Sequence, residues 1–430
     1  MKLLTVMFHG LHEGSVRLGQ LSYDKHLGYF EYDKTFLERG LEISPFALPS
    51  GTLLFEGESE PFNGLHGVFA DSLPDGWGLK LMDRALTQAG IDVAGLTPLD
   101  RLAFVGDRAI GALSYEPDEG ESIYGSKGEL LDIDYLASEA IKVYTGEVDD
   151  VIEELADSSV SPQGARPKSL IALNGDQAVS GAHDAPEGFE HWLIKYPCSK
   201  SAEDRAEGSI EYLYSDMARG ANIDFPDTLL KPSKDGQNAY FLTKRFDRLN
   251  NQRIHTHTLA GLVGANFRVS DYSYEQMLRV CKHLCHSHSE MLQLYKRMVF
   301  NVMAGNRDDH TKNFSFVMDH QGQWRNSQAY DITFNRGING WHSMAIADAG
   351  RLVTGDNLRA VGRACGIPKN ESYAAFDEVA TALEQWFDEA PHYMIPKSKL
   401  VEISKHICDS RRLIMPKTFS VDDPGKLEPK

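Results

Sequence analysis

Hydrophobic and polar positions divide the chain into a strand-rich first part and a helix-rich last part. Over the first fifty residues, short apolar runs alternate with glycine-containing breaks, which is typical of half-buried strands. Residues 71–90 and 134–156 carry the apolar spacing of amphipathic helices. From about residue 270 the helical period dominates. We therefore expect a β-rich first module with a few helices, which ends near residue 130, and a helical C-terminal part.

The middle of the chain alternates apolar strands with one helix. Strands are predicted at 169–173, 191–196 and 239–246, with a helix from about Ser209 to Gly220 between the second and the third. Before the first of these strands lies a loop of small residues, 158–169. Such a loop can turn backbone N–H groups toward phosphate oxygens, although an ordinary turn has the same composition.

One lysine in this middle section is a candidate ligand-binding residue. Lys195 lies within the second predicted strand, where a lysine is costly to bury unless it is paired. Glu211, on the following helix, can form with it the Lys–Glu pair by which kinases hold the ATP phosphates. The alternative is an edge-strand lysine that points to solvent.

Composition excludes some classes of function. The 430 residues include 62 acidic and 44 basic side chains, a formal net charge of −18, which argues against unaided binding to a nucleic-acid backbone. Five cysteines, scattered from Cys198 to Cys408, do not form a disulfide framework. The apolar start is broken at His9 and is too short for a signal peptide, and no apolar run is long enough to span a membrane. We therefore expect a cytoplasmic protein.

The segment from 306 to 331 carries the most informative chemistry. Asp308 stands five residues before Asn313, and Asp331 follows eighteen residues later, after a strand-like run at 314–318. Protein kinases use this order: one Asp accepts the proton of the attacking hydroxyl, while the Asn and the later Asp hold magnesium against ATP. A lone D-x4-N is more often a capped helix with a solvated hairpin. The added strand and the second Asp favour the kinase interpretation.

The chain resembles, nearly end to end, the HipA family of serine/threonine kinases, which are toxins of bacterial type II toxin–antitoxin pairs. The segments that carry the resemblance are Phe69–Gly78, Val105–Leu113, Ser161–Ser169, Ile194–Pro197 and Lys244–Arg248. The last three of these are similar to the family's phosphate loop, its ATP-binding lysine and the segment that contacts the adenine. Asp308, Asn313 and Asp331 match the family's catalytic base and its two metal ligands.

The resemblance implies an α+β, kinase-like (HipA-type) fold with two lobes. Residues 1–130 would form a β-rich N-terminal subdomain, and residues 131–256 a nucleotide-binding lobe with the phosphate loop. Residues 257–430 would form an all-helical C-terminal lobe with the catalytic loop and the metal site.

The resemblance also implies roles for single residues. Asp308 would be the catalytic base in preference to the adjacent Asp309, Asn313 and Asp331 would bind Mg²⁺, and Ser161 would be the site of autophosphorylation. Further residues of the matching segments would contact ATP. They are Gln163, Gly164, Ala165, Arg166, Lys168, Lys195, Lys244, Phe246, His310, Lys312 and Tyr330.

The implied partners are a small DNA-binding antitoxin (HipB-like), which would provide the only link to DNA, and a protein substrate such as an aminoacyl-tRNA synthetase. The chain departs from the family at Arg166-Pro167, where Gln-Glu is common, and at Pro162, which follows the expected phosphoserine. Two alternatives stay open. Small-molecule kinases, such as aminoglycoside and choline kinases, use a comparable Asp…Asn…Asp order, and a kinase-like fold can serve a non-catalytic regulator or corepressor.

A cluster of cysteine and histidine presents a competing interpretation. Cys281 and Cys285 stand one helical turn apart, and His288 extends the same face. This spacing allows a zinc site. The segment lies in an apolar helical run, where cysteine is an ordinary buried residue, so the sequence favours a place in the core.

Overall fold

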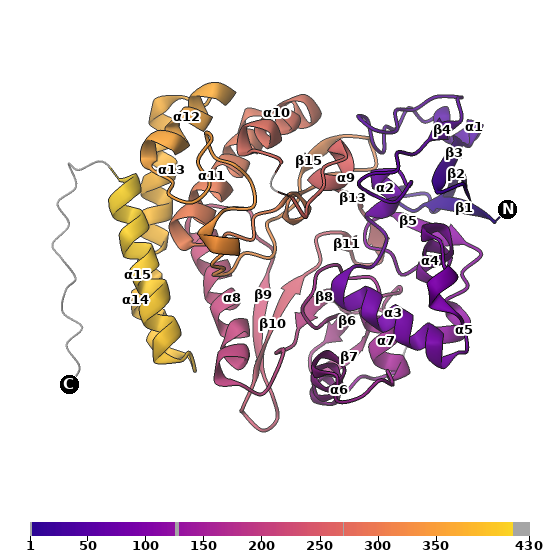
Figure 1. Cartoon of the computed structure of the whole chain (residues 1–430), viewed down its shortest axis with the longest axis horizontal. Coiled ribbons are helices and arrows are strands. Elements are labelled where there is room, and N and C mark those ends of the chain that lie inside the picture. The colour runs from indigo at the N-terminus through magenta and orange to yellow at the C-terminus, as the bar shows by residue number, and fades with distance from the viewer. Residues whose placement is uncertain (1, 125–128, 270, 416–430) are drawn as a thin grey trace.

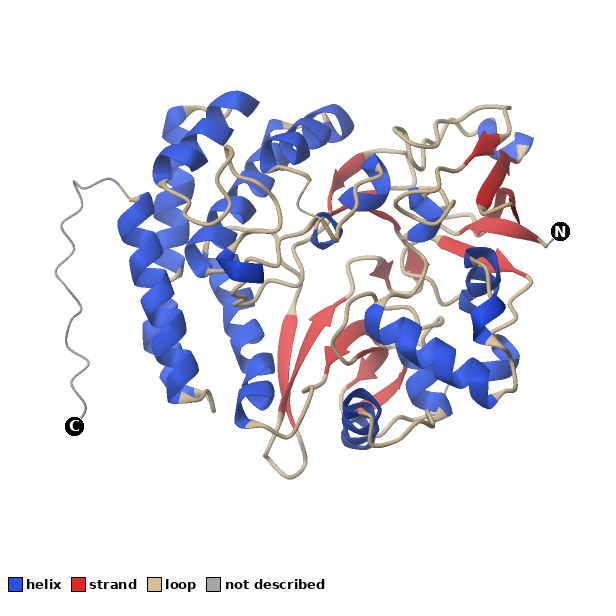
Figure 2. Cartoon of the chain, in the orientation of Figure 1, coloured by secondary structure: helices blue, strands red, loops and turns tan. Residues whose placement is uncertain are grey.

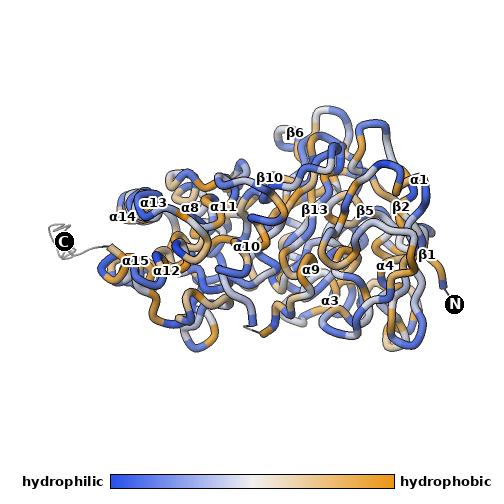
Figure 3. The backbone as a smooth tube through the Cα atoms, turned by 90° about the horizontal axis from the view of Figure 1, so that it is seen from above, coloured by the Kyte–Doolittle hydropathy of each residue, from blue (hydrophilic) through white to orange (hydrophobic). Residues whose placement is uncertain are grey.

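The computed structural model describes residues 2–124, 129–269 and 271–415. The N-terminal strands lie at one end of the molecule and the C-terminal helices at the other, with a second sheet between them (Figure 1). Most buried apolar residues form one cluster that extends from the first strand to the last helix, and Ala172, Val179 and Ala185 form a small second cluster. Apolar and polar stretches alternate along the whole backbone, as expected when each element buries one face (Figure 3).

The N-terminal subdomain is built on an antiparallel sheet of strand order β4-β3-β2-β1-β5. Leu4, Val6 and Phe8 alternate along β1 and are fully buried, which confirms the predicted half-buried pattern. The strands are β1 (Leu3–Phe8), β2 (Val16–Asp24), β3 (Leu27–Tyr32), β4 (Phe55–Glu56) and β5 (Leu113–Glu116). The helices are α1 (Lys34–Leu37), α2 (Gly67–Ala70), α3 (Gly76–Gln88), α4 (Pro98–Val105) and α5 (Glu121–Tyr124).

The helical stretch predicted at 134–156 is in fact two helices, α6 (Ile133–Thr145) and α7 (Glu153–Ser159). Gly146 ends the first helix because it adopts a left-handed conformation, with φ of 79°, in which its N–H reaches back to the last carbonyls. The second helix takes up Ser158 and Ser159. The loop predicted at 158–169 is therefore helical at its start.

The middle sheet has the strand order β7-β6-β8-β10-β9, all antiparallel. The long helix α8 (Ala202–Gly220) packs on β9 and β10 (Figure 2). It begins earlier than predicted because Ser201 caps it by accepting a hydrogen bond from the N–H of Asp204. The predicted strands are present. The sheet comprises β6 (Lys168–Asn174), β7 (Gln177–Ser180), β8 (Glu190–Lys195), β9 (Thr228–Pro232) and β10 (Ala239–Lys244).

The C-terminal lobe is helical around one small sheet rather than free of strands. The run predicted as a strand at 314–318 pairs on both sides, in the order β13-β14-β15, and a short β11–β12 hairpin leads into this lobe. The strands are β11 (Arg248–Leu249), β12 (Gln252–Arg253), β13 (His255–Thr258), β14 (Ser315–Met318) and β15 (Trp324–Asn326). The helices are α9 (Leu259–Val263), α10 (Tyr274–Cys285), α11 (His288–Ala304), α12 (Gly355–Cys365), α13 (Lys369–Ala382), α14 (Gln385–Glu389) and α15 (Lys397–Ile414).

Helix α11 is the centre of the C-terminal lobe. It contacts α10, α13 and α15, and its second half is buried without a break from Leu294 to Ala304. Gly305 ends it, and the candidate catalytic segment follows directly. A rigid helix therefore holds the start of this segment. None of the described helices is both long enough and apolar enough to cross a membrane.

Candidate active site

A cavity of about 610 Å³ lies where the N-terminal subdomain, the middle sheet and the C-terminal lobe meet. All the residues that the sequence assigns to ATP, to the metal and to catalysis line this cavity, from Gln163 in the phosphate loop to Asp331. Ser161, the expected phosphosite, does not line it. The sequence thus identified side chains that come together from positions more than 160 residues apart.

Two lysines, Lys168 and Lys195, lie side by side in the lining of the cavity. Lys168 on β6 and Lys195 on β8 are directly opposite each other in the antiparallel ladder, so their side chains share one face of the sheet. The Nζ atom of Lys195 lies 2.5 Å from Oε1 of Glu211 and also contacts Asp331. The Lys–Glu pair expected from the sequence is thus present.

The charges around the two lysines are unequally balanced. Burial alone would lower the pKa of Lys195, but Asp331 and Glu211 raise it above its usual value. The pKa of Lys168 is lowered by burial, and the neighbouring Lys195 contributes to that shift. Lys168 donates only to the carbonyl of Gln163, at 2.6 Å. An anion that entered here would stabilise both charged lysines. These four residues, Lys168, Lys195, Glu211 and Asp331, form what we name the cleft cluster.

Asp331 is the acidic residue of this cluster that comes from the C-terminal lobe. Burial would raise its pKa, but Lys195 and Lys168 hold it well below the usual range, so the side chain is a carboxylate. Its backbone adopts φ of 54°, a left-handed conformation that is uncommon outside glycine. Such conformations persist where the surrounding structure fixes them, often at functional sites.

Asp308 and Asp309 are adjacent but have different environments. The side chain of Asp308 is 51% exposed at the cavity, whereas that of Asp309 is fully buried. Asp309 accepts hydrogen bonds from Tyr274 at 2.6 Å and His342 at 2.8 Å, and from a backbone N–H. Asp309 is therefore occupied in holding the segment together, and only Asp308 can reach a substrate.

Asn313 lies in a 3₁₀ turn next to Asp308. Its Nδ2 atom donates to the backbone carbonyl of Asp308, at 2.6 Å, which leaves Oδ1 available for another partner. The pKa of Asp308 is raised because the group is partly buried and because Asp331 and Asp309 are also negative, although His310 opposes the shift. A carboxylate with a raised pKa is a better proton acceptor.

Part of the cavity lining is apolar. The rings of Phe246 and Tyr330 lie 5.5 Å apart, and Phe241 and Leu193 line the same cavity. Lys244 lines it as well and forms an ion pair with Glu190. This combination suits a flat heteroaromatic ring with a polar edge.

Arg166, one of the departures from the family pattern, and the cavity residues His310 and Lys312 have structural partners. Arg166 forms an ion pair with Glu207 on α8, at 3.1 Å, which ties the phosphate loop to that helix. His310 and Lys312 share an aromatic neighbour, Phe267, whose ring centre lies 4.5 Å from the Lys312 ammonium. Both residues line the cavity, as does Ala165.

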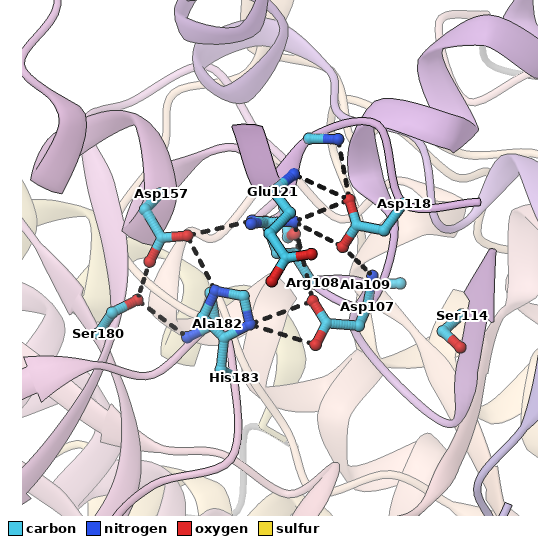
Figure 4. Close-up of polar contacts among 12 residues, drawn as sticks. Asp107, Arg108, Ala109, Ser114, Asp118, Glu121, Asp157, Ser180, Ala182 and His183 are labelled. Atoms are coloured by element: carbon cyan, nitrogen blue, oxygen red, sulfur yellow. Dashed lines mark hydrogen bonds and ion pairs between the residues drawn. The ribbon is translucent and has the colours of Figure 1, made fainter. Parts of the chain in front are cut away.

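Ser161 is buried outside the cavity. Its Oγ donates to the backbone carbonyl of Arg108, at 2.5 Å. The Arg108 guanidinium, itself fully buried, contacts Asp157 at 3.1 Å and Asp118 at 3.0 Å (Figure 4). His183 contacts Asp157 at 3.0 Å. We name Arg108, Asp118, Asp157 and His183 the interface network, because it joins the N-terminal subdomain to the middle lobe.

The cysteine–histidine cluster does not share one helix face. Helix α10 ends at Cys285, and His288 begins the next helix, where it pairs with Glu371 at 2.6 Å. Cys281 is buried and lies 3.6 Å from Asn326. The expectation that His288 extends the face of the cysteines is therefore wrong. The helix ends because His286 takes a left-handed conformation.

Several residues that line the cavity were not assigned chemistry from the sequence, and Asp75 is one of them. Asp75, from the N-terminal subdomain, accepts hydrogen bonds from the N–H of Gly164 and from Lys312. The motif Phe69–Gly78 was noticed in the sequence only as a family signature. Its partners are too distant in the chain for any local pattern to reveal them.

Comparisons with known proteins agree with this arrangement. A family model described as the HipA-like C-terminal domain matches residues 160–387, and the HipA N-terminal domain matches residues 11–116. No curated protein sequence matches the chain.

Among solved structures, HipA of Shewanella oneidensis MR-1, in a toxin–antitoxin complex with HipB and operator DNA, has a TM-score of 0.67. It is 17% identical, and the match covers 96% of each chain. The proinflammatory kinase CtkA of Helicobacter pylori has a TM-score of 0.37 at 10% identity, over 52% of this chain and 88% of its own. The match to HipA confirms the expected kinase-like, two-lobed fold of the HipA type. Because the C-terminal domain match alone covers more than half of the residues, the chain belongs to the HipA family.

Proposed function

We propose that the chain is an ATP-dependent serine/threonine protein kinase and the toxin of a HipA/HipB-like toxin–antitoxin pair. The observation that carries this proposal is the position of Lys195 between Glu211 and Asp331, in a cavity whose exposed acid is Asp308. Kinases use this combination to position ATP and to accept the proton of the attacking hydroxyl. A non-catalytic protein has no chemical need for it.

The donor set fits Mg²⁺. The Oδ1 of Asn313 and the carboxylate of Asp331 are hard oxygen ligands, and Mg²⁺ takes few protein ligands because it keeps waters and binds phosphate. Bound there, the ion would neutralise negative charge on the phosphates. We assign Asn313 and Asp331 to this role.

The remaining cavity residues would contact either the phosphates of ATP or its adenine. Lys168, Lys195 and the backbone of the phosphate loop would bind the phosphates, because both ammonium groups and the loop line the cavity. The apolar part of the lining, with Phe246 and Tyr330, would accept the adenine. Gln163, Ala165, Arg166, Lys244, His310 and Lys312 complete the proposed contacts.

Asp308 is proposed as the catalytic base. A serine or threonine hydroxyl that reaches its exposed carboxylate loses its proton to it as the oxygen attacks the terminal phosphorus of ATP. The bond from that phosphorus to the bridging oxygen breaks, and ADP leaves. The raised pKa of Asp308 favours the proton transfer.

We propose Ser161 as the autophosphorylation site. In this structure Ser161, Ser158 and Ser159 are all buried. A phosphate on Ser161 would add about −1.5 to −2 charges. The Arg108 carbonyl and the carboxylates of the interface network would repel that charge, and the Arg108 guanidinium is already paired with Asp118 and Asp157, so the loop would have to leave its place.

The proposed partners are a HipB-like antitoxin, which would bind DNA on behalf of the pair, and a protein substrate such as an aminoacyl-tRNA synthetase. The S. oneidensis HipA structure, which contains HipB and operator DNA, supports the antitoxin as a partner. The net charge of −18 is consistent with DNA contact through a partner.

We retain 1–130, 131–256 and 257–430 as the proposed domain limits.

The proposal is tested by phosphoryl transfer from Mg·ATP to proteins of a bacterial lysate, beside a panel of amino alcohols and aminoglycosides. We expect the phosphoryl group to be transferred to a protein of the lysate and not to the amino alcohols or aminoglycosides. Asp308→Asn should lower transfer by about 10²–10⁴-fold, the usual contribution of a general base, with Mg·ATP still bound. Asp377→Asn, on an exposed face of α13, is the matched control and should act as wild type. Transfer by Asp308→Asn at the wild-type rate would refute the assignment.

A further inference from the structure

We propose that Asp75 is a positioning residue through which the N-terminal subdomain holds the phosphate loop and the catalytic segment in one geometry. This inference rests on the proposed kinase function. The carboxylate of Asp75 accepts from the N–H of Gly164 through Oδ1 and from Nζ of Lys312, at 2.9 Å, through Oδ2. One side chain of the first subdomain thus joins the two other parts of the site.

Asp75 occupies the N-cap position of α3 but does not cap that helix. Aspartate is among the best N-cap residues, because its carboxylate can accept the free N–H groups of the first turn. Here no such hydrogen bond forms, although the backbone is extended, as a cap requires. The carboxylate is turned to Gly164 and Lys312 instead. A residue that gives up a local stabilising contact for a distant one is expected at functional sites.

The residues after Asp75 hold the same loop at both of its ends. The N–H of Trp77 donates to the carbonyl of Gly164, at 2.9 Å, and its indole N–H donates to the carbonyl of Lys168, at 3.0 Å. Gly76 has φ of 40°, and a Cβ atom there would lie 2.7 Å from the Gly164 carbonyl oxygen. This close approach requires glycine. The segment Asp75–Trp77 is therefore shaped to the phosphate loop.

The charge of Asp75 is suited to holding donors rather than to binding a phosphate. Burial would raise its pKa, but Lys312, the Gly164 N–H and Lys168 lower it below the usual range. A carboxylate repels phosphate, and the carboxylate of Asp75 is surrounded by groups that we propose bind ATP. Its effect on catalysis must therefore pass through Gly164 and Lys312.

The decisive measurement is hydrogen–deuterium exchange of the nucleotide-free protein, which does not depend on activity. In Asp75→Asn, peptides that cover residues 163–168 should exchange about tenfold faster than in wild type, the usual effect of losing a charged hydrogen bond. Peptides from β1 and β2 should be unchanged, which shows that the subdomain is folded. Asp83→Asn is the matched control: it lies on α3 and pairs with Arg101 at 2.5 Å, outside the cavity, and it should leave the loop unchanged.

Kinetics supply the second readout. Asp75→Asn should raise KM for ATP by about tenfold, because the phosphate loop is mispositioned, and should lower kcat at saturating ATP by a smaller factor, because the catalytic segment loses its Lys312 contact. Wild-type exchange of the loop, or equal acceleration in Asp83→Asn, would overturn the proposal, as would a fall in kcat at unchanged KM. A wild-type protein without kinase activity would refute the proposed function instead, and the exchange experiment would still decide the role of Asp75.

Discussion

Two clusters of buried charge meet the phosphate loop, one at each end, and they differ in what surrounds them. The interface network beside Ser161 surrounds one fully buried cation, Arg108, with carboxylates, and none of its residues lines the cavity. The cleft cluster, which includes Lys168 at the other end of the loop, places two lysines next to each other in the cavity lining.

This difference separates structure from function. A packed ionic network stabilises the fold only as long as each charge keeps its partner. The cleft cluster combines like charges, a lowered pKa at Lys168 and a left-handed backbone at Asp331, features that cost stability unless a ligand is bound. We therefore expect substitutions in the first cluster to change stability and those in the second to change ligand binding.

The largest expected effect tests the cleft cluster. Asp331→Asn removes the charged member of a two-residue metal site, so the affinity for Mg·ATP should fall by about 100-fold or more. The unfolding free energy without ligand should fall only modestly, because Lys195 loses one ion pair but keeps Glu211 as its partner. Isothermal titration and chemical denaturation measure the two quantities. Unchanged Mg·ATP affinity would remove Asp331 from the metal site.

A reverse pattern is expected in the interface network. Asp157→Asn removes a charged partner from Arg108, which keeps only Asp118 at hydrogen-bond distance, and from His183. The free energy of unfolding should fall by about 1.5–3 kcal/mol, the value of a buried hydrogen bond to a charged group. KM for ATP in the folded enzyme should stay near wild type. A tenfold rise in KM without loss of stability would show that the two clusters are not separate.

The sequence predicted the cleft cluster better than the interface network for a physical reason. A lysine in an apolar strand is conspicuous because burial is costly, and the order of Asp308, Asn313 and Asp331 is short enough to recognise. The partners of Arg108 and Asp75 are chosen by three-dimensional packing. Asp157 lies 49 residues from Arg108, and nothing local to either residue marks the pair.

The fold shows the same division. The strands could be predicted from the alternation of apolar and polar residues, and the helices from the spacing of apolar residues and from capping residues. The split of 134–156 was missed although its signal was present, since Gly146 is a typical C-terminal cap. The strands of the C-terminal lobe beyond 314–318 were missed because β13 has the polar sequence HTHT and β15 has only three residues, and each pairs with β14. Pairing of this kind is set by tertiary contacts.

The smallest expected effect concerns pH and the histidine of the interface network. Burial alone would lower the pKa of His183, but hydrogen bonds with Asp107 and Asp157 raise it above its usual value. A raised folded-state pKa adds stability that is fully present below the unfolded pKa, about 6.5, and is lost as the pH rises through the folded one. The free energy by which wild type exceeds His183→Gln should therefore decrease as the pH rises above about 6.5.

His191 provides a control of opposite sign. Its pKa is lowered, first by burial and then by Arg245, so its contribution is present above the unfolded pKa and is lost as the pH falls. The difference between wild type and His191→Gln should shrink below about pH 6.5, where the His183→Gln difference is largest. Denaturation curves from mildly acidic to mildly basic pH measure both. Two differences with the same slope would show that His183 is not held charged by its carboxylates, and that the interface network is not the ionic structure described above.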